Sequence, residues 1–188
     1  MASPAAGNTP APEDDLARLL VRRIAHDLAT PAGALAVALE LAPAADPLLG
    51  AAVGRLTALL DLHRSLFGAP PDSPFDPALL GTLLEGQRLE TSPGLDGRTA
   101  RGLAALALDA AALLAGPGTY RLAVDDGQPA VALAGRVRPP GAALAAVLAG
   151  APPAEPGTIG AALAVRLLGP FTTEAGPDRL TLRAAARQ

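Results

Sequence analysis

One histidine of the chain stands beside a carboxylate and shortly before a proline, in a run whose residue types could support chemistry. The run contains His26, Asp27, Thr30 and Pro31. A solvent-facing imidazole can act as a base, a metal ligand or a nucleophile. Asp27 could accept a hydrogen bond from one ring nitrogen, which would make the other nitrogen more nucleophilic, and Thr30 could orient a water or a phosphoryl oxygen. His26 is therefore the first candidate for a reactive group.

The spacing of apolar residues predicts that this run is helical. At about 100° per residue, Ile24 and Leu28 each lie about 200° from His26, and Leu35 lies about 180° from it. The helix would then bury one side and expose the imidazole on the other. Pro31 removes one backbone hydrogen bond and is expected to kink this helix without ending it.

Two arginines precede the histidine by about one helical turn. Arg22 and Arg23 could face an acidic partner or a phosphoryl group. The alternative is that His26 is an ordinary surface residue and that Arg23 and Asp27 form a simple i, i+4 ion pair. Periodicity alone leaves both interpretations open.

Composition limits the classes of function. Half of the 188 residues are hydrophobic but only 2% are aromatic, so the core must consist of leucine, alanine and valine. A net charge of −3 argues against nucleic-acid binding, because phosphate contacts need clustered positive charge. The absence of cysteine excludes disulfides and thiolate sites, and two histidines without a third ligand argue against a metal site. With no signal-peptide pattern and no spanning apolar run, we expect a cytoplasmic protein that does not contact membranes.

The N-terminal third predicts a helical hairpin. Residues 1–13 have the composition of a disordered tail, and residues 14–68 form two helices joined by a short turn, the second beginning at Asp46-Pro47 and ending at Gly68. An isolated antiparallel hairpin would leave its apolar stripe exposed. We therefore expect a homodimer in which two hairpins form a four-helix bundle.

The remainder predicts a second domain, which makes the chain an α+β protein. Residues 69–75 are a proline-rich linker, and residues 76–188 alternate helical and strand patterns typical of a small α/β sandwich. Helices are expected over 76–87, 97–115, 140–148 and 158–168. Strands are expected over 88–92, 120–124, 130–133, 171–174 and 179–183, with a hairpin turn at Asp125-Asp126-Gly127. The sheet should be mixed or antiparallel, with helices on one face.

The run Arg23-Ile24-Ala25-His26-Asp27-Leu28-Ala29-Thr30-Pro31 resembles the H-box of histidine kinases. With its continuation to Leu41, it looks most like the ChpT-type histidine phosphotransferases of bacterial phosphorelays. Their second helix closes with an aromatic-Arg-x-x-Phe-Gly pattern, and His63-Arg64-Ser65-Leu66-Phe67-Gly68 is similar. His63 stands where that pattern has an aromatic residue, which favours a packing role over a second phosphorylation site.

The resemblance implies roles for the matching positions. His26 would carry the phosphoryl group, Asp27 would be its hydrogen-bonding base, and Thr30 would assist transfer or dephosphorylation. Receiver domains of a hybrid histidine kinase and of response regulators would dock on the same helix, around the following residues: Arg22, Arg23, Ala29, Pro31 and Gly33.

A kinase would also need a nucleotide site in the second domain. The chain has a single asparagine, Asn8, so its long helix cannot supply one for magnesium, and Gly157 to Gly160 is only a weak match to a glycine lid. We therefore expect a degenerate, Bergerat-like histidine-kinase ATPase domain without cofactor or metal, Mg²⁺ belonging to the receiver. The predicted function is a histidine phosphotransferase; the alternatives are an ATP-dependent sensor histidine kinase and a non-catalytic dimeric scaffold.

Overall fold

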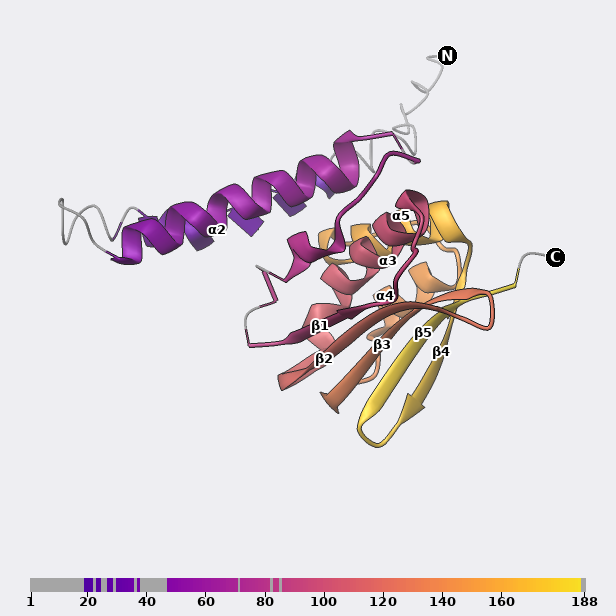
Figure 1. Cartoon of the computed structure of the whole chain (residues 1–188). Coiled ribbons are helices and arrows are strands. Elements are labelled where there is room, and N and C mark those ends of the chain that lie inside the picture. Colours follow the sequence, from indigo (N-terminus) through magenta and orange to yellow (C-terminus); the bar gives the residue numbers. More distant parts are fainter. Residues whose placement is uncertain are drawn as a thin grey trace, which may run out of the picture.

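A helical N-terminal part lies beside a sheet covered by helices on one face (Figure 1). The computed structural model describes residues 19–21, 23–24, 27–28, 30–35, 37, 47–70, 72–81, 83–84 and 86–186. The described residues from 19 to 37 are helical, and we call them the N-terminal helical segment. Within the part of the chain that the structure describes, no helix combines the length and the apolar character needed to cross a membrane.

Five strands form one mixed sheet in the order β1-β2-β3-β5-β4. They are β1 Arg88–Thr91, β2 Leu114–Asp125, β3 Gln128–Val137, β4 Phe171–Gly176 and β5 Arg179–Ala184. β1 runs parallel to β2, and every other neighbouring pair is antiparallel. The predicted mixed sheet is confirmed.

The turn between β2 and β3 follows from its sequence. Asp125 pairs with Gln128, and the two residues between them, Asp126 and Gly127, have φ angles of 54° and 78°. Positive φ at both central positions is the type I′ turn that matches strand twist, and Asp-Gly is a preferred pair for it. The predicted hairpin is confirmed.

Three helices cover one face of the sheet (Figure 1). They are α3 Gly97–Ala110, α4 Ala142–Leu148 and α5 Ile159–Leu168. The predicted extension of the first of these to residue 115 is wrong. α3 ends at Ala110, a 3₁₀ turn follows, and β2 begins at Leu114, which pairs with Val137. Sheet pairing therefore overrides the helical preference of a leucine- and alanine-rich run, and Gly116-Pro117 could not continue the helix.

The predicted helix over residues 76–87 is also shorter than expected. A single 3₁₀ turn, Pro77–Leu80, begins where the side chain of Asp76 accepts a hydrogen bond from the backbone of Ala78. Gly81 follows, and the buried Leu80 and Leu84 pin the segment onto the core. Short turns take the place of a regular helix here, with the backbone N–H groups of Leu83 and Leu84 both bonded to the carbonyl oxygen of Leu80 at 3.0 Å.

The segment predicted as a linker is bonded to α3. Helix α2, Pro47–His63, continues as a π-helical turn that ends at Gly68, as expected, and the chain then passes over α3. The buried guanidinium of Arg101 donates hydrogen bonds to the carbonyl oxygens of Ser65 and Ser73, at 3.0 and 3.2 Å, and to that of Pro70. The division into two domains stays a prediction, but this connection is held at several points.

Candidate functional site

The eight predicted site residues fall between positions 22 and 33 of the sequence, and the structure describes five of them. His26, Arg22 and Ala29 lie outside the described residues. Arg23, Asp27, Thr30, Pro31 and Gly33 are described, all in helical conformation. Pro31 therefore lies within the helix, as predicted, since residues on both sides of it are helical.

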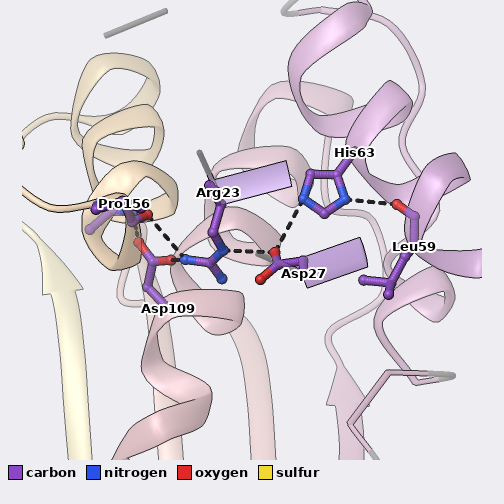
Figure 2. A network of polar contacts seen from close by, with 7 residues as sticks. Arg23, Asp27, Leu59, His63, Asp109 and Pro156 are labelled. Carbon is purple, nitrogen blue, oxygen red and sulfur yellow. Dashed lines mark hydrogen bonds and ion pairs between the residues drawn. The ribbon is translucent and has the colours of Figure 1, made fainter. Parts of the chain in front are cut away.

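Asp27, the residue after His26, is held through its carboxylate (Figure 2). Arg23 Nε donates a hydrogen bond of 2.7 Å to Asp27 Oδ2, which is the i, i+4 pair that the sequence offered as the alternative to a role for Arg23 in binding a partner. His63 Nε2, at the end of α2, lies 3.3 Å from the same oxygen, within ion-pair distance but without the alignment of a hydrogen bond. Two elements therefore approach Asp27 Oδ2 from different parts of the chain.

Arg23 joins this carboxylate to a second one. Its Nη1 atom donates to Asp109 Oδ1 in α3 at 2.7 Å and to the carbonyl oxygen of Pro156 at 3.3 Å. The Arg23 side chain is 11% exposed and that of Asp109 is fully buried. The expectation that Arg23 binds a partner stays a prediction, and in this chain its guanidinium links the N-terminal helical segment to α3.

Asp109 also holds the start of α5. Its Oδ2 atom accepts a hydrogen bond of 2.7 Å from the backbone N–H of Ala161. Gly160 makes this approach possible, because a Cβ atom there would collide with the carbonyl oxygen of Ala105 in α3. The run from Gly157 to Gly160, which matched a glycine lid only weakly, thus leads into a helix packed tightly against α3.

Burial and neighbouring charges act in opposite directions on the pKa values of Asp109 and Arg23. Burial raises the pKa of Asp109 to about 6, although Arg23 and the N–H of Ala161 favour its ionised form. Burial alone would lower the pKa of Arg23, but the Asp109 and Asp27 carboxylates outweigh it, and the pKa is raised. Arg23 therefore stays charged, while Asp109 can take up a proton in mildly acidic solution.

His63 is buried at 5% exposure, in agreement with its predicted packing role. Its Nδ1 atom lies 2.8 Å from the carbonyl oxygen of Leu59, and its ring centroid lies 5.9 Å from that of Phe67. The sequence did not predict its contact with Asp27. Finding that contact requires knowing how the N-terminal helical segment packs on α2.

Thr30 and Gly33 lie on an accessible side of the N-terminal helical segment. Both are exposed, and the neighbouring Ala32 and Ala34 are exposed as well, whereas Pro31 is buried. A Cβ atom added to Gly33 would meet nothing within 4 Å. One turn beyond Asp27, the surface therefore consists of small side chains and a hydroxyl group.

The side chains of Arg23, Asp27, His63 and Asp109 form one network of polar contacts. Sequence reasoning missed Asp109 as a residue of this network. One signal was present: a single aspartate within the leucine- and alanine-rich run of α3 must be paired if it is buried. The sequence alone offered no way to identify Arg23, 86 residues away, as its partner.

The structure separates this network from a cavity of about 540 Å³. The cavity lies between α5, residues 150–153 and the π-helical turn after α2, and its wall includes Leu20, Phe67 and Leu163. Neither Asp27 nor Thr30 lines it. Among the described residues, no group of three or more histidine and acidic side chains could hold a metal ion.

Comparison with known proteins places the chain by fold. No family model matches it, and no curated protein matches it. A solved structure described as a bacterial phosphotransferase, determined at 1.7 Å, is 18% identical and aligns over 94% of this chain and 98% of its own, with a TM-score of 0.74. A histidine kinase from Burkholderia phymatum STM815 is 16% identical over 96% of this chain and 98% of its own, with a TM-score of 0.36, too low to support an argument. The first likeness shows a shared fold.

Proposed function

We propose that this chain is a histidine phosphotransferase that passes a phosphoryl group between the aspartates of two receiver domains through His26. The observation that carries the proposal is the fixed carboxylate of Asp27, next to His26 in the sequence, with exposed Thr30 one turn further along the helix. The phosphotransferase with the same fold supports the same class of activity.

The transfer needs few groups on this chain. A ring nitrogen of His26 attacks the phosphorus of an aspartyl phosphate, a P–N bond forms as the P–O bond breaks, and the receiver aspartate leaves as a carboxylate. The imidazole then carries a positive charge, which Asp27 balances by accepting a hydrogen bond or the proton from the other ring nitrogen. Transfer to the second receiver reverses these steps, with Mg²⁺ held by the receivers.

The contacts at the start of α5 favour a histidine phosphotransferase over an ATP-dependent histidine kinase. Backbone N–H groups at a helix N-terminus are a common site for nucleotide phosphates. Here the N–H of Ala161 donates to the carboxylate of Asp109, and Arg23 compensates the charge of that carboxylate. The chain's own side chains thus occupy the site that a phosphate would use.

The docking surface that we propose is the exposed side of the N-terminal helical segment. Thr30 and Gly33 contribute to it, and His26, Arg22 and Ala29 are proposed to do so. Small side chains there would let a receiver domain bring its aspartate close to the imidazole. Arg23 and buried Pro31 would support this surface from inside the chain.

The chain would work as a homodimer built on the two N-terminal helices. Val53 and Leu60 of α2 are 46% and 44% exposed, and Val21 and Val37 of the N-terminal helical segment are more exposed still. Large apolar side chains repeated along a helix pair favour association with a second copy, as in a four-helix bundle.

A labelling experiment tests the proposed function. Receiver domains phosphorylated with acetyl phosphate are mixed with the wild-type chain and with His26→Ala, without ATP. Wild type should become labelled and His26→Ala should not, because the only other histidine is buried. Equal labelling of both would contradict the proposal. Labelling of wild type by ATP alone would instead identify a kinase.

A further inference from the structure

The contact between His63 and Asp27 points to a second role for the histidine of α2. We propose that His63 is a positioning residue that orients the carboxylate of Asp27 for phosphoryl transfer at His26. This inference rests on the proposed function and extends it to a residue outside the H-box run.

The hydrogen bond of His63 fixes which ring nitrogen faces Asp27. Nδ1 lies 2.8 Å from the carbonyl oxygen of Leu59, and a carbonyl only accepts, so Nδ1 carries a hydrogen and donates it. Nε2 is then the atom that faces Asp27 Oδ2, at 3.3 Å. When the ring carries its second proton, Nε2 lies at ion-pair distance from that oxygen.

The ring has little freedom to leave this orientation. Its side chain is 5% exposed, its Nδ1 is bonded within α2, and the ring of Phe67 lies beside it. Reorienting the imidazole would break the bond to Leu59 in a buried environment. The ring edge that faces Asp27 is therefore fixed by contacts within α2 and the π-helical turn that follows it.

Arg23 provides the second point of support for the same oxygen. It is anchored in turn by Asp109 and the carbonyl oxygen of Pro156, on the other side of the network (Figure 2). Asp27 Oδ2 thus lies between His63 Nε2 from α2, at ion-pair distance, and a donor anchored on α3. Such a two-sided arrangement restricts rotation of the carboxylate, which matters because a reacting group works best when its orientation is set in advance.

The charges around Asp27 fit this role. Among the described residues, the polar contacts around Asp27 join two carboxylates, Asp27 and Asp109, to one guanidinium, Arg23, so a further N–H group facing Asp27 Oδ2 is favoured there. A phenylalanine at position 63 could pack beside Phe67 but could not donate to Asp27, which makes it a suitable test variant.

The test uses the full-length chain and phosphoramidate, a small donor whose P–N bond breaks with release of ammonia as His26 is phosphorylated. Initial rates are measured over a range of phosphoramidate concentrations for wild type, His63→Phe, His63→Gln, Asp27→Asn and the Asp27→Asn/His63→Phe double variant. Glutamine keeps a neutral N–H donor near the position of Nε2. Circular dichroism checks that each variant is folded.

His63→Phe should lower the maximal rate about ten-fold or more with little change in KM, because orientation and not donor binding is lost. His63→Gln should recover most of the rate. In the Asp27→Asn background, His63→Phe should have almost no further effect, because the positioned group is already gone.

The inference alone would be overturned by a His63→Phe rate within two-fold of wild type, or by an equal effect of His63→Phe in the wild-type and Asp27→Asn backgrounds. Absence of phosphoryl groups on His26 in wild type would instead overturn the proposed function, and this inference with it. A folded His63→Gln variant as slow as His63→Phe would also contradict the role of the donor.

Discussion

The covered sheet and the N-terminal helices bury their apolar side chains differently. Leu106 of α3 and Leu133 of β3 are completely buried within one chain. Along α2, Leu62 is buried against the same core, whereas Val53 and Leu60 remain exposed. The sheet region and the end of α2 therefore share one closed core, whereas the middle of α2 leaves apolar side chains exposed.

The network of Arg23 connects these two regions. One of its carboxylates, Asp109, belongs to the sheet region, and the other, Asp27, belongs to the N-terminal helices. The sheet region thus supports the predicted reactive helix through a buried ion pair, in addition to apolar packing. The predictions below test this division of roles, from the largest expected effect to the smallest.

The first prediction compares a buried leucine of the sheet region with an exposed leucine of α2. Leu106→Ala should lower the free energy of unfolding by about 2 to 5 kcal/mol, because it leaves a cavity in a closed core. Leu60→Ala should lower it by less than about 1 kcal/mol in dilute solution. Its effect should grow with protein concentration, because a residue buried between two copies acts through association. Denaturation at several protein concentrations measures the effects of both substitutions on the free energy of unfolding. An effect of Leu60→Ala that does not change with protein concentration would contradict the dimer.

The second prediction concerns the pH dependence of the link between the regions. Because the pKa of Asp109 is raised from 3.8 to about 6, the folded chain holds this proton more tightly than the unfolded chain. Its contribution to stability is therefore greatest below pH 4 and declines as the pH rises to about 6. At about 1.4 kcal/mol per pKa unit, the full shift corresponds to about 3 kcal/mol. Relative to Asp109→Asn, the free energy of unfolding of wild type should therefore fall by about 2 kcal/mol between pH 4 and pH 7, because part of the change lies outside this range.

Asp96 at the start of the same helix is the matched control. Its pKa is lowered, chiefly by the hydrogen bond from the backbone of Thr99. Relative to Asp96→Asn, wild type should therefore lose stability as the pH falls, the opposite direction. Because the pKa of Asp96 is lowered from 3.8, its loss occurs below about pH 4, whereas that of Asp109 occurs above it. Urea unfolding of the three proteins from about pH 2 to pH 7 measures both slopes, and parallel slopes for the two comparisons would refute the account of Asp109.

The third prediction concerns the close contact of α3 and α5. Gly160→Ala should lower the free energy of unfolding by about 1 to 3 kcal/mol, because the new Cβ meets the carbonyl oxygen of Ala105 and lies 3.0 Å from Asp109 Cγ. Gly157→Ala should change it by less than about 0.5 kcal/mol, because nothing lies within 4 Å of its Cβ. Thermal unfolding of the two variants measures the difference in their free energies of unfolding. Equal stability of the two variants would contradict a close contact of α3 and α5 that cannot adjust.

The parts of this molecule that follow from local sequence were predictable. Asp126-Gly127 determines its turn through backbone conformation alone, and the H-box run lies within a few consecutive residues. The end of α3 at Ala110 was not predictable, because pairing of Leu114 with Val137 decides it. The Asp109–Arg23 pair likewise depends on packing between residues far apart in the chain, which no local pattern encodes.

The central claim is that His26 carries the phosphoryl group, and the most direct measurement is to locate that group. The full-length chain is incubated with a phosphorylated receiver domain and no ATP, and tandem mass spectrometry identifies the modified residue. The account predicts phosphorylation of His26, lost in His26→Ala and retained at a lower rate in His63→Phe. Phosphoryl groups on any other residue, or labelling that requires ATP, would contradict it.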